Sequence, residues 1–184
     1  RPTYERGILK HCLIQKFNLK SVLEIGFGRG YSTFCMAKAM CDLNIDGKIT
    51  TVDPNLDENF LKQLQSIFPS QWFSKINFVK STAENFYKEN LSEAYDIIYI
   101  DGDHRYEAVK IDWEYAKNHF NKFVLFDDYH ASNKLQKDIE CSTLIDEIKG
   151  YHKELIIMDR RIFFDDRLIP DEKIDYGQVL LSKE

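Results

Sequence analysis

The chain has 184 residues, of which 43% are hydrophobic and 14% aromatic, and it carries a formal net charge of −5. This length fits one α/β domain, taken here as residues 1–184, with enough apolar material for a substantial core. A negative net charge gives no general attraction to nucleic acids or anionic membranes. No run of about 18 apolar residues predicts a membrane span, and no signal peptide is predicted. We therefore expect neither nucleic acid nor membrane as a partner.

The four cysteines form no C-x-x-C pair and have no histidine spacing typical of a zinc site. Three of them, Cys12, Cys35 and Cys141, lie among apolar residues at helical spacing. We expect reduced thiols that serve as small core residues. Reduced thiols favour a cytoplasmic location.

Helices and strands alternate along most of the chain. A first helix is predicted over residues 3–17 from an apolar stripe of Ile8, Leu9, Cys12, Leu13 and Phe17. Five short apolar runs then predict strands, at residues 21–27, 48–53, 76–80, 95–100 and 122–127. A helix is predicted after each strand, at residues 31–40, 59–68, 83–88, 106–120 and 135–149, the last stopping at Gly150.

Three late strands, at residues 154–158, 161–164 and 178–182, follow one another without a long helix. The predicted fold is therefore a Rossmann-like, doubly wound, mostly parallel sheet with helices on both faces and an antiparallel C-terminal strand ending. Ligands of such sheets bind outside the carboxyl ends of the strands. Loops are predicted at residues 53–58, 101–105, 129–134 and 165–175.

A glycine-rich turn of the form E-x-G-x-G-x-G joins the first of these strands to its helix, at residues 24–30. Glycine has no Cβ, so the backbone can turn sharply and approach a ligand closely. The following helix offers unpaired N–H groups that suit a carboxylate. A dinucleotide fingerprint, G-x-G-x-x-G, would need a glycine at position 31, where the chain has Tyr31.

This turn resembles the nucleotide-binding turn of class I S-adenosylmethionine-dependent methyltransferases. The resemblance implies S-adenosylmethionine as cofactor, with Glu24, Gly26, Gly28 and Gly30 at its site. Asp53 ends the second strand, where an acid can accept hydrogen bonds from both ribose hydroxyls. An aspartate that starts a turn before a proline is the alternative interpretation of Asp53.

The adenine side of such a site follows the third strand. Thr82 and Ala83 occupy this position here. The family often has an aspartate where Thr82 stands, so the chain departs from the family pattern at the expected adenine contact.

Acidic residues and histidines follow two neighbouring strands, in IDGDH at residues 100–104 and FDDYH at residues 126–130. The carboxyl ends of parallel strands meet at one edge of the sheet, so four carboxylates are expected close together. Like charges at such distances repel, and a hard divalent cation would offset them. The alternative interpretation is that these residues cap turns or are solvated loop residues.

The pattern D-G-D-H-x-Y-E-x-V-x-x-D followed by D-D-Y-H resembles small metal-dependent O-methyltransferases of the catechol and the macrolide- and aminocoumarin-sugar types. Together the resemblances cover about residues 22–130. They imply Asp101, Asp127 and Asp128 as ligands of a divalent cation such as Mg²⁺, with Asp101 also beside the cofactor. Asp103 and His104 match positions of the general base in different branches, and both stay open.

The resulting prediction is methyl transfer from S-adenosylmethionine to a hydroxyl of a small-molecule acceptor, with a metal that lowers the pKa of that hydroxyl. Adjacent oxygens, as in a catechol, would suit the metal. Three alternatives remain: a metal-dependent enzyme of the same fold with other, hydroxylase-like chemistry; metal-free methylation of nitrogen or carbon; and a non-catalytic cofactor-binding or assembly module. No oligomeric state is predicted.

Overall fold

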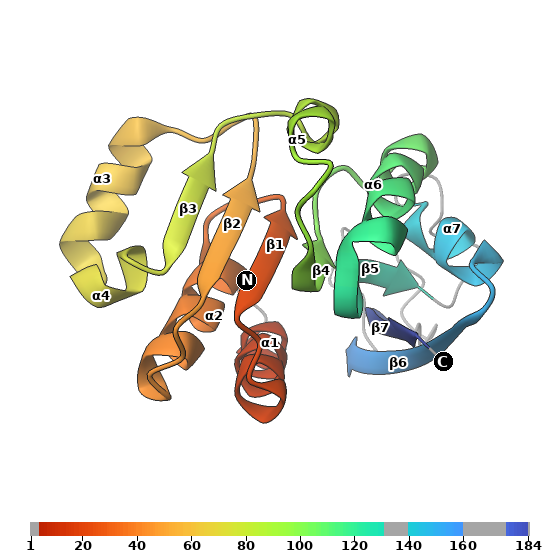
Figure 1. The fold of residues 1–184 in the computed structure, drawn as a ribbon, viewed down its shortest axis with the longest axis horizontal. Coiled ribbons are helices and arrows are strands. Elements are labelled where there is room, and N and C mark those ends of the chain that lie inside the picture. The colour runs from red at the N-terminus through yellow and green to blue at the C-terminus, as the bar shows by residue number, and fades with distance from the viewer. Residues whose placement is uncertain (1–3, 131–139, 160–175, 184) are drawn as a thin grey trace, which may run out of the picture.

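Seven strands form one sheet in the computed structural model, which describes residues 4–130, 140–159 and 176–183 (Figure 1). Their order across the sheet is β3-β2-β1-β4-β5-β7-β6. The strands are β1 Ser21–Ile25, β2 Lys48–Val52, β3 Ile76–Val79, β4 Tyr95–Ile100, β5 Phe120–His130, β6 Tyr151–Asp159 and β7 Tyr176–Lys183.

Strands β1 to β5 pair in parallel, whereas β7 runs antiparallel to both of its neighbours, β5 and β6. The predicted mostly parallel sheet with an antiparallel ending is therefore confirmed. The strand predicted at residues 161–164 and the loop at 165–175 lie outside the described residues.

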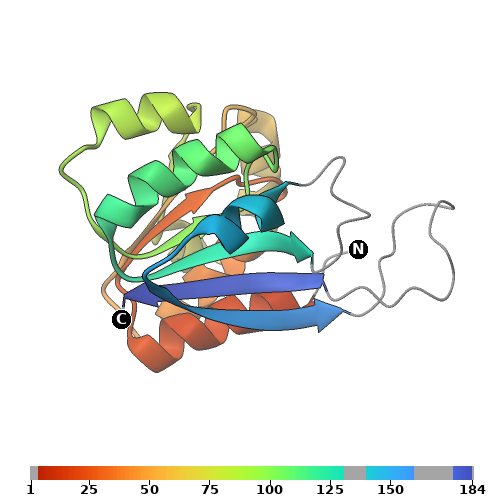
Figure 2. The same ribbon diagram turned by 90° about the vertical axis from the view of Figure 1, so that its right-hand side faces the viewer.

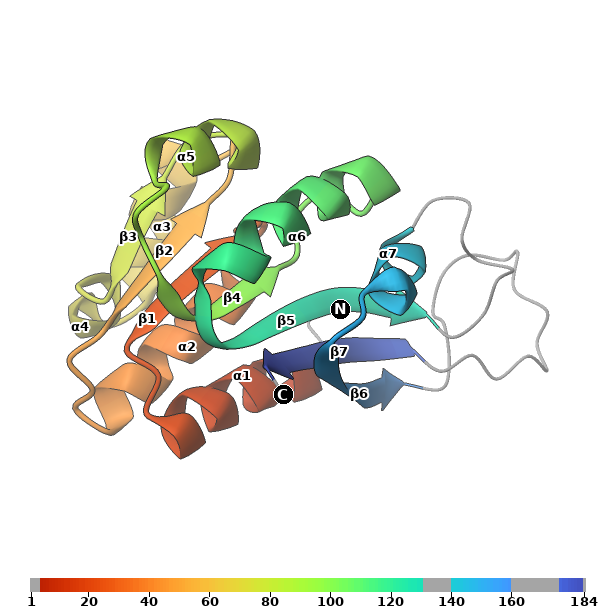
Figure 3. The same ribbon diagram turned by 45° about the vertical axis from the view of Figure 1, so that its right-hand side comes forward.

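Helices cover both faces of the sheet, with α6 above and α1 below in Figure 2 and again on opposite sides in Figure 3. The helices are α1 Tyr4–Phe17, α2 Tyr31–Asp42, α3 Glu58–Ile67, α4 Ser70–Phe73, α5 Ala83–Glu89, α6 Tyr106–His119 and α7 Cys141–Glu147. None of those found in the described ranges has the length and apolar character needed to cross a membrane.

Side chains of the central strands point alternately to the two faces of the sheet, and each face has its own hydrophobic core. In β1, Leu23 belongs to the core beneath α5, α6 and α7, and Val22 belongs to the core beneath α1 and α2. In β4 the same alternation sends Ile98 to the first core and Tyr99 to the second. Burying one such apolar side chain contributes about 1.5–3 kcal/mol, so each register is strongly specified.

The buried face of α1 agrees with the predicted stripe only in part: Leu13 is buried and Leu9 and Phe17 pack against the core, but Ile8 and Cys12 do not. Ile8 is 62% exposed and Cys12 is exposed, whereas the buried residues are Gly7, Lys10, Leu13 and Ile14. A Cβ on Gly7 would lie 2.6 Å from the Tyr31 hydroxyl and 2.7 Å from Cys35 Sγ, so α1 and α2 meet at this glycine. This close approach turns Lys10 toward the sheet, and the prediction of Cys12 as a core thiol is wrong.

The other elements differ from prediction mainly at their ends. Strand β5 continues to His130, past the predicted end at residue 127, because β7 pairs with it. Helix α7 ends at Glu147, and Gly150, with φ 77°, makes the turn into β6. Residues 135–139, predicted as the start of this helix, lie outside the described residues. All four cysteines are free thiols, and Cys141 is buried.

Candidate active site

The glycine turn is held against the ends of two neighbouring strands. The Gly26 amide donates to the Val52 carbonyl at 2.9 Å, and the Asp101 amide donates to the Ile25 carbonyl at 2.9 Å. Gly26 has φ 94°, and a Cβ there would lie 2.7 Å from the carbonyl carbon of Asp101 and closer still to its oxygen. The backbone of the turn therefore packs directly on the end of β4, as only glycine permits.

Gly28 differs from Gly26, although its φ of 53° is also positive. A Cβ at Gly28 would have no atom within 4 Å, because this glycine faces open space. That space is a pocket of about 640 Å³ at the carboxyl ends of the strands. Six of the eight predicted cofactor residues line it: Gly26, Gly28, Asp53, Thr82, Ala83 and Asp101.

The other two predicted cofactor residues, Glu24 and Gly30, do not line this pocket. Glu24 is fully buried beneath the turn, where its carboxylate accepts a hydrogen bond from the Thr33 hydroxyl. Burial raises the pKa of Glu24 to about 7. Gly30 packs on the ring of Phe27 and is the N-cap residue of α2. Both residues shape the turn, and their contact with a cofactor stays a prediction.

Asp53 braces the glycine turn from β2. Its Oδ2 accepts hydrogen bonds from the backbone amides of Phe27 at 3.0 Å and Gly28 at 3.1 Å. Its Oδ1 accepts from the Asn55 amide at 2.7 Å. The carboxylate thus joins the turn to the loop after β2, and it also lines the pocket. The structure therefore shows Asp53 as a turn residue at the pocket, and its contact with a ribose stays a prediction.

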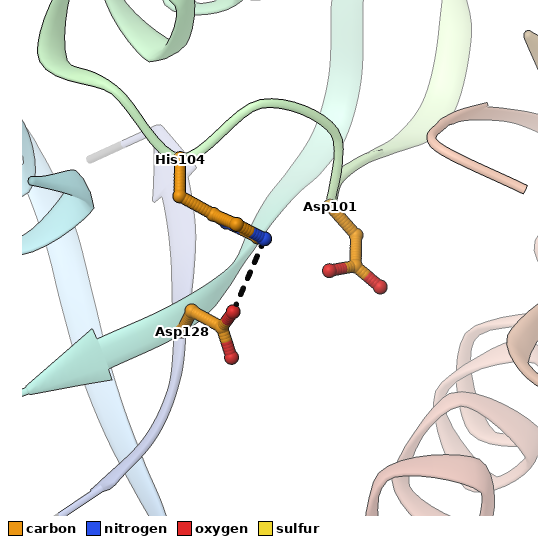
Figure 4. Close-up of side chains that lie close together, drawn as sticks. All are labelled: Asp101, His104 and Asp128. Atoms are coloured by element: carbon orange, nitrogen blue, oxygen red, sulfur yellow. Dashed lines mark ion pairs between the residues drawn. The ribbon is translucent and has the colours of Figure 1, made fainter. Parts of the chain in front are cut away.

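A second polar cluster adjoins the pocket, and Asp101 belongs to both. Asp101, His104 and Asp128 each offer one ligand atom, and these atoms all lie within 4.8 Å of one another. Figure 4 shows the three side chains converging from the end of β4, the following loop and β5. His104 Nε2 lies 3.3 Å from Asp128 Oδ2.

A bulge in β5 sets the directions of the two consecutive aspartates, Asp127 and Asp128. The register of β5 against β7 shifts between Phe126 and Tyr129, and Asp128 has φ 54°. Bulges of this kind redirect side chains near active sites. Asp127 is buried, and its Oδ1 accepts from the Asp128 amide at 2.8 Å.

The Tyr99 hydroxyl lies between two of the predicted metal ligands. It contacts Asp101 Oδ2 at 2.6 Å and also Asp127 Oδ2. Burial, followed by the charge of Asp127, raises the pKa of Asp101 well above its usual range. The structure therefore brings Asp101, Asp127 and Asp128 together at the ends of β4 and β5. Asp127 contacts Tyr99, and it is not one of the three residues, Asp101, His104 and Asp128, whose ligand atoms converge.

Two cations from α1 complete this side of the site, and neither was predicted. Arg6 donates through Nη1 to Asp127 Oδ2 and through Nη2 to Asp128 Oδ1, both at 2.9 Å. Lys10 is 2% exposed, and its Nζ lies 4.0 Å from the centre of the Tyr99 ring. Burial lowers the pKa of Lys10 although carboxylates surround it. The sequence feature that could have indicated a buried Lys10 is its position on the same helical stripe as Gly7, Leu13 and Ile14.

A family model described as a methyltransferase domain matches residues 23–129, from the middle of β1 to the bulge in β5. This is more than half of the chain. The chain belongs to this methyltransferase family. The resemblance to class I methyltransferases seen in the glycine turn is thereby confirmed.

Solved structures share the fold of this methyltransferase. The O-methyltransferase TomG from Streptomyces achromogenes, in complex with SAM, is 15% identical, with a TM-score of 0.67 over 98% of this chain and 80% of TomG. An O-methyltransferase from Bacillus cereus in complex with SAH is 17% identical, with a TM-score of 0.68 over 100% of this chain and 82% of that one. A putative caffeoyl-CoA O-methyltransferase from Staphylococcus aureus is 20% identical, with a TM-score of 0.66 over 98% of this chain and 83% of that one.

The two candidate bases of the methyltransferase have different surroundings. Asp103 is exposed and is held by the Arg105 guanidinium, whose hydrogen bond lowers the pKa of this carboxyl. A lower pKa makes Asp103 a weaker base. His104 instead lies between Asp128 and Cys141, whose Sγ is 3.7 Å from Nδ1. Asp103 lines the pocket, whereas His104 belongs to the cluster with Asp101 and Asp128, and both stay candidates for the base.

His130, the histidine that ends the FDDYH segment, is 3% exposed. Its backbone amide donates to the Ser142 hydroxyl at 2.7 Å, which ties the end of β5 to α7. Burial lowers the pKa of its imidazole. These surroundings fit a supporting residue.

Replacing Asp53 by alanine is expected to loosen the glycine turn and weaken cofactor binding together. The turn amides of Phe27 and Gly28 would lose a charged acceptor, and hydrogen bonds of this kind contribute about 1.5–3 kcal/mol each, less where solvent reaches them. We expect a lower melting temperature and a larger dissociation constant for S-adenosylhomocysteine by calorimetry.

Asp57→Ala is the matched control. Asp57 caps α3 through the Phe60 amide and lies outside the pocket lining, so its loss should cost about 1 kcal/mol of stability without changing affinity. An Asp53→Ala variant that binds like the unmodified protein would show that Asp53 is only a turn residue.

Proposed function

We propose that this methyltransferase transfers a methyl group from S-adenosylmethionine to a hydroxyl oxygen of a small-molecule acceptor. The observation that carries the proposal is the position of Asp101, which lines the glycine-turn pocket and also belongs to the cluster with His104 and Asp128. A donor in the pocket and an acceptor at the cluster would then be neighbours. The likeness of the fold to O-methyltransferases that bind SAM or SAH supports the assignment.

The pocket offers a place for each part of the donor. The N-terminus of α2, behind the glycine turn, suits the carboxylate of the methionine portion. Asp53 is proposed to bind the ribose, and its oxygens also accept hydrogen bonds from backbone amides. Thr82 and Ala83 line the adenine end, where the Thr82 hydroxyl also accepts from the Asn85 amide at 3.3 Å. The bound cofactor supplies an electrophilic methyl group on its sulfonium.

The carboxylates of Asp101 and Asp128 fit a divalent cation, since carboxylate oxygens are suitable ligands for Mg²⁺ or Mn²⁺. The imidazole of His104 offers a ring nitrogen within 4.8 Å of an oxygen of each carboxylate, and the proposal keeps it as the base and not as a metal ligand. A bound divalent cation lowers the pKa of an acceptor hydroxyl. Asp127 is proposed as a further member of the site, and its present partners are Arg6 and Tyr99.

His104 is proposed to remove the proton of the acceptor hydroxyl. Asp128 at 3.3 Å stabilises the imidazolium that results, and Cys141 packs beside the other ring nitrogen. Burial raises the pKa of the Cys141 thiol to about 12, so this thiol stays protonated and is no competing nucleophile. Holding acceptor and donor in line contributes the remaining part of the rate.

Arg6 favours a second candidate, methyl transfer without a metal. Its guanidinium already offsets the charges of Asp127 and Asp128, as a cation would. The pair of His104 and Asp128 would then act as the base on its own.

Calorimetry with S-adenosylhomocysteine tests the cofactor assignment. We expect a dissociation constant on the order of 10⁻⁶ to 10⁻⁴ M, because the pocket presents a preformed turn and a carboxylate for the ribose. NAD is the control ligand, since Tyr31 breaks the dinucleotide fingerprint. Saturable binding of NAD, with none of S-adenosylhomocysteine, would contradict the proposal.

A further inference from the structure

Asp112 is a buried carboxylate on the wall of the cofactor pocket. It is 4% exposed, stands in the middle of α6 and lines the pocket together with Ala108 and Ile111 of the same helix. Among the described residues that line this pocket, it is the only polar side chain that is buried. Aspartate is rarely buried unless its carboxylate is paired, so the partners of Asp112 carry information about its role.

One partner holds the carboxylate in place. The hydroxyl of Tyr87 in α5 donates to Asp112 Oδ1 at 2.7 Å. The Tyr87 ring stacks on the ring of Tyr115, with centroids 4.1 Å apart and an interplanar angle of 14°, and the Tyr115 hydroxyl donates to the Asn90 carbonyl at 2.9 Å. This packing ties α5 to α6 and fixes the position of the carboxylate.

The second oxygen of Asp112, Oδ2, is the atom that remains for a ligand. No residue in the described parts of the chain donates a hydrogen bond to it, whereas a carboxylate can accept about four. Burial raises the pKa of Asp112 to about 7, because one hydrogen bond compensates only part of the lost hydration. A donor group on a ligand in the pocket would supply the missing contact.

Asp112 lies at the end of the pocket that is lined by Thr82 and Ala83. Its partner Tyr87 stands one turn after Ala83 in α5, so their hydrogen bond places the carboxylate beside the first turn of this helix. Ala83 has no polar side-chain atom, and the Thr82 hydroxyl already accepts from the Asn85 amide at 3.3 Å. The buried carboxylate is therefore the strongest acceptor at this end.

The chemistry of adenine matches such an acceptor. The base has one hydrogen-bond donor, its exocyclic amino group, because its unsubstituted ring nitrogens are acceptors. An ionised carboxylate is only an acceptor, so at the adenine end it can pair only with this amino group. The other donors of the cofactor, on its ribose and its methionine portion, belong with Asp53 and the glycine turn in the proposed function.

We propose that Asp112 accepts a hydrogen bond from the amino group of adenine and thereby selects adenine over other purines. This inference rests on the cofactor assignment of the proposed function. Tyr87 is a positioning residue, which holds the carboxylate through Oδ1 and leaves Oδ2 for the base. The selectivity for the base then comes from α6 as well as from the segment after β3.

The test compares S-adenosylhomocysteine with S-inosylhomocysteine, in which a carbonyl oxygen replaces the amino group, by calorimetry at pH 8. We expect the unmodified protein to bind the adenosyl ligand about 10- to 100-fold more tightly, because a carbonyl oxygen and a carboxylate are both acceptors. Asp112→Asn introduces an amide that can donate to the carbonyl oxygen. We expect this variant to bind the adenosyl ligand about tenfold more weakly and to bind the inosyl ligand at least as tightly as the adenosyl one.

Asp96→Asn is the matched control, because it makes the same substitution at another shielded aspartate. The Asp96 carboxylate accepts from the backbone amides of Lys20 at 2.7 Å and Ser21 at 3.4 Å, and Asp96 is outside the pocket lining. Its substitution is expected to lower the melting temperature and to leave the preference for the adenosyl ligand unchanged. A change in preference is thus a readout that a purely structural role of Asp112 would not produce.

Equal binding of the two ligands by the unmodified protein would overturn the role of Asp112 while leaving the cofactor assignment in place. A preference that persists undiminished in Asp112→Asn would also overturn it, since another group would then distinguish the bases. If Asp112→Asn fails to fold, Asp112→Ser decides by the same ratio of affinities. Absence of binding of both ligands by the unmodified protein overturns the inference and the cofactor assignment together.

Discussion

Methyl transfer is expected to stop when a chelator is added, and Mg²⁺ or Mn²⁺ is expected to restore it. Asp101 and Asp128 place carboxylate ligands beside the cofactor pocket, with His104 next to them as the proposed base, and lowering the pKa of the acceptor hydroxyl is the part of the reaction that a metal would supply. The assay follows S-adenosylhomocysteine formed with catechol or 3,4-dihydroxybenzoate, whose adjacent oxygens suit such a site. Removing a metal of this role should cost several orders of magnitude in rate.

Two controls separate the metal from the donor and from the base. S-adenosylhomocysteine affinity should change little in chelator, because Asp101 is the one lining residue of the pocket that is also a proposed metal ligand, and the glycine turn and the segments after β2 and β3 line the rest of the donor side. His104→Ala should lower the rate by about 10²–10⁴-fold at saturating metal, as loss of a general base does. Undiminished turnover in excess chelator would remove the metal from the reaction and favour the pair of His104 and Asp128 acting alone.

The sequence predicted the parts of the site that follow from local pattern. Short apolar runs, a glycine turn and acids at strand ends are all local signals, and they located the sheet and the pocket lining. Glu24 is predicted as a cofactor residue, but its side chain is buried and does not line the pocket. A sequence motif does not show which face of a strand another element covers. In the structure Glu24 bonds to Thr33 of α2 beneath the turn.

The contribution of α1 could not be predicted in this way, because it depends on contacts between distant segments. Gly7 lets α1 approach Tyr31 and Cys35 of α2 closely, which rotates Lys10 toward Tyr99 and brings Arg6 to the β5 bulge. The bulge itself arises from the pairing of β5 with β7, some 50 residues later in the chain. Helix periodicity alone predicted a stripe that included Ile8 and Cys12 with Leu13, and it gave no sign that Lys10 lies on the buried face.

Gly26→Ala is expected to destabilise the fold severely, whereas Gly28→Ala is expected to leave it largely intact. At Gly26 the new Cβ would clash with the backbone of Asp101, which β4 fixes in place and which no rotamer change can relieve. Overpacking of this kind costs about 1–3 kcal/mol or more, and a strained positive φ adds about 1–3 kcal/mol. Against a total stability of about 5–15 kcal/mol, this lowers the melting temperature by roughly 10 °C or prevents folding.

Gly28 provides the matched comparison within the same turn. Its φ of 53° costs an alanine only about 1 kcal/mol, and its Cβ would meet no protein atom within 4 Å. The methyl group would instead enter the pocket, so we expect near-normal melting but roughly tenfold weaker binding of S-adenosylhomocysteine. Melting curves and calorimetry on the two variants measure both effects. If Gly26→Ala and Gly28→Ala have the same melting temperature, the turn does not depend on its contact with the end of β4. If Gly28→Ala binds normally, the open space at Gly28 is not where the cofactor lies.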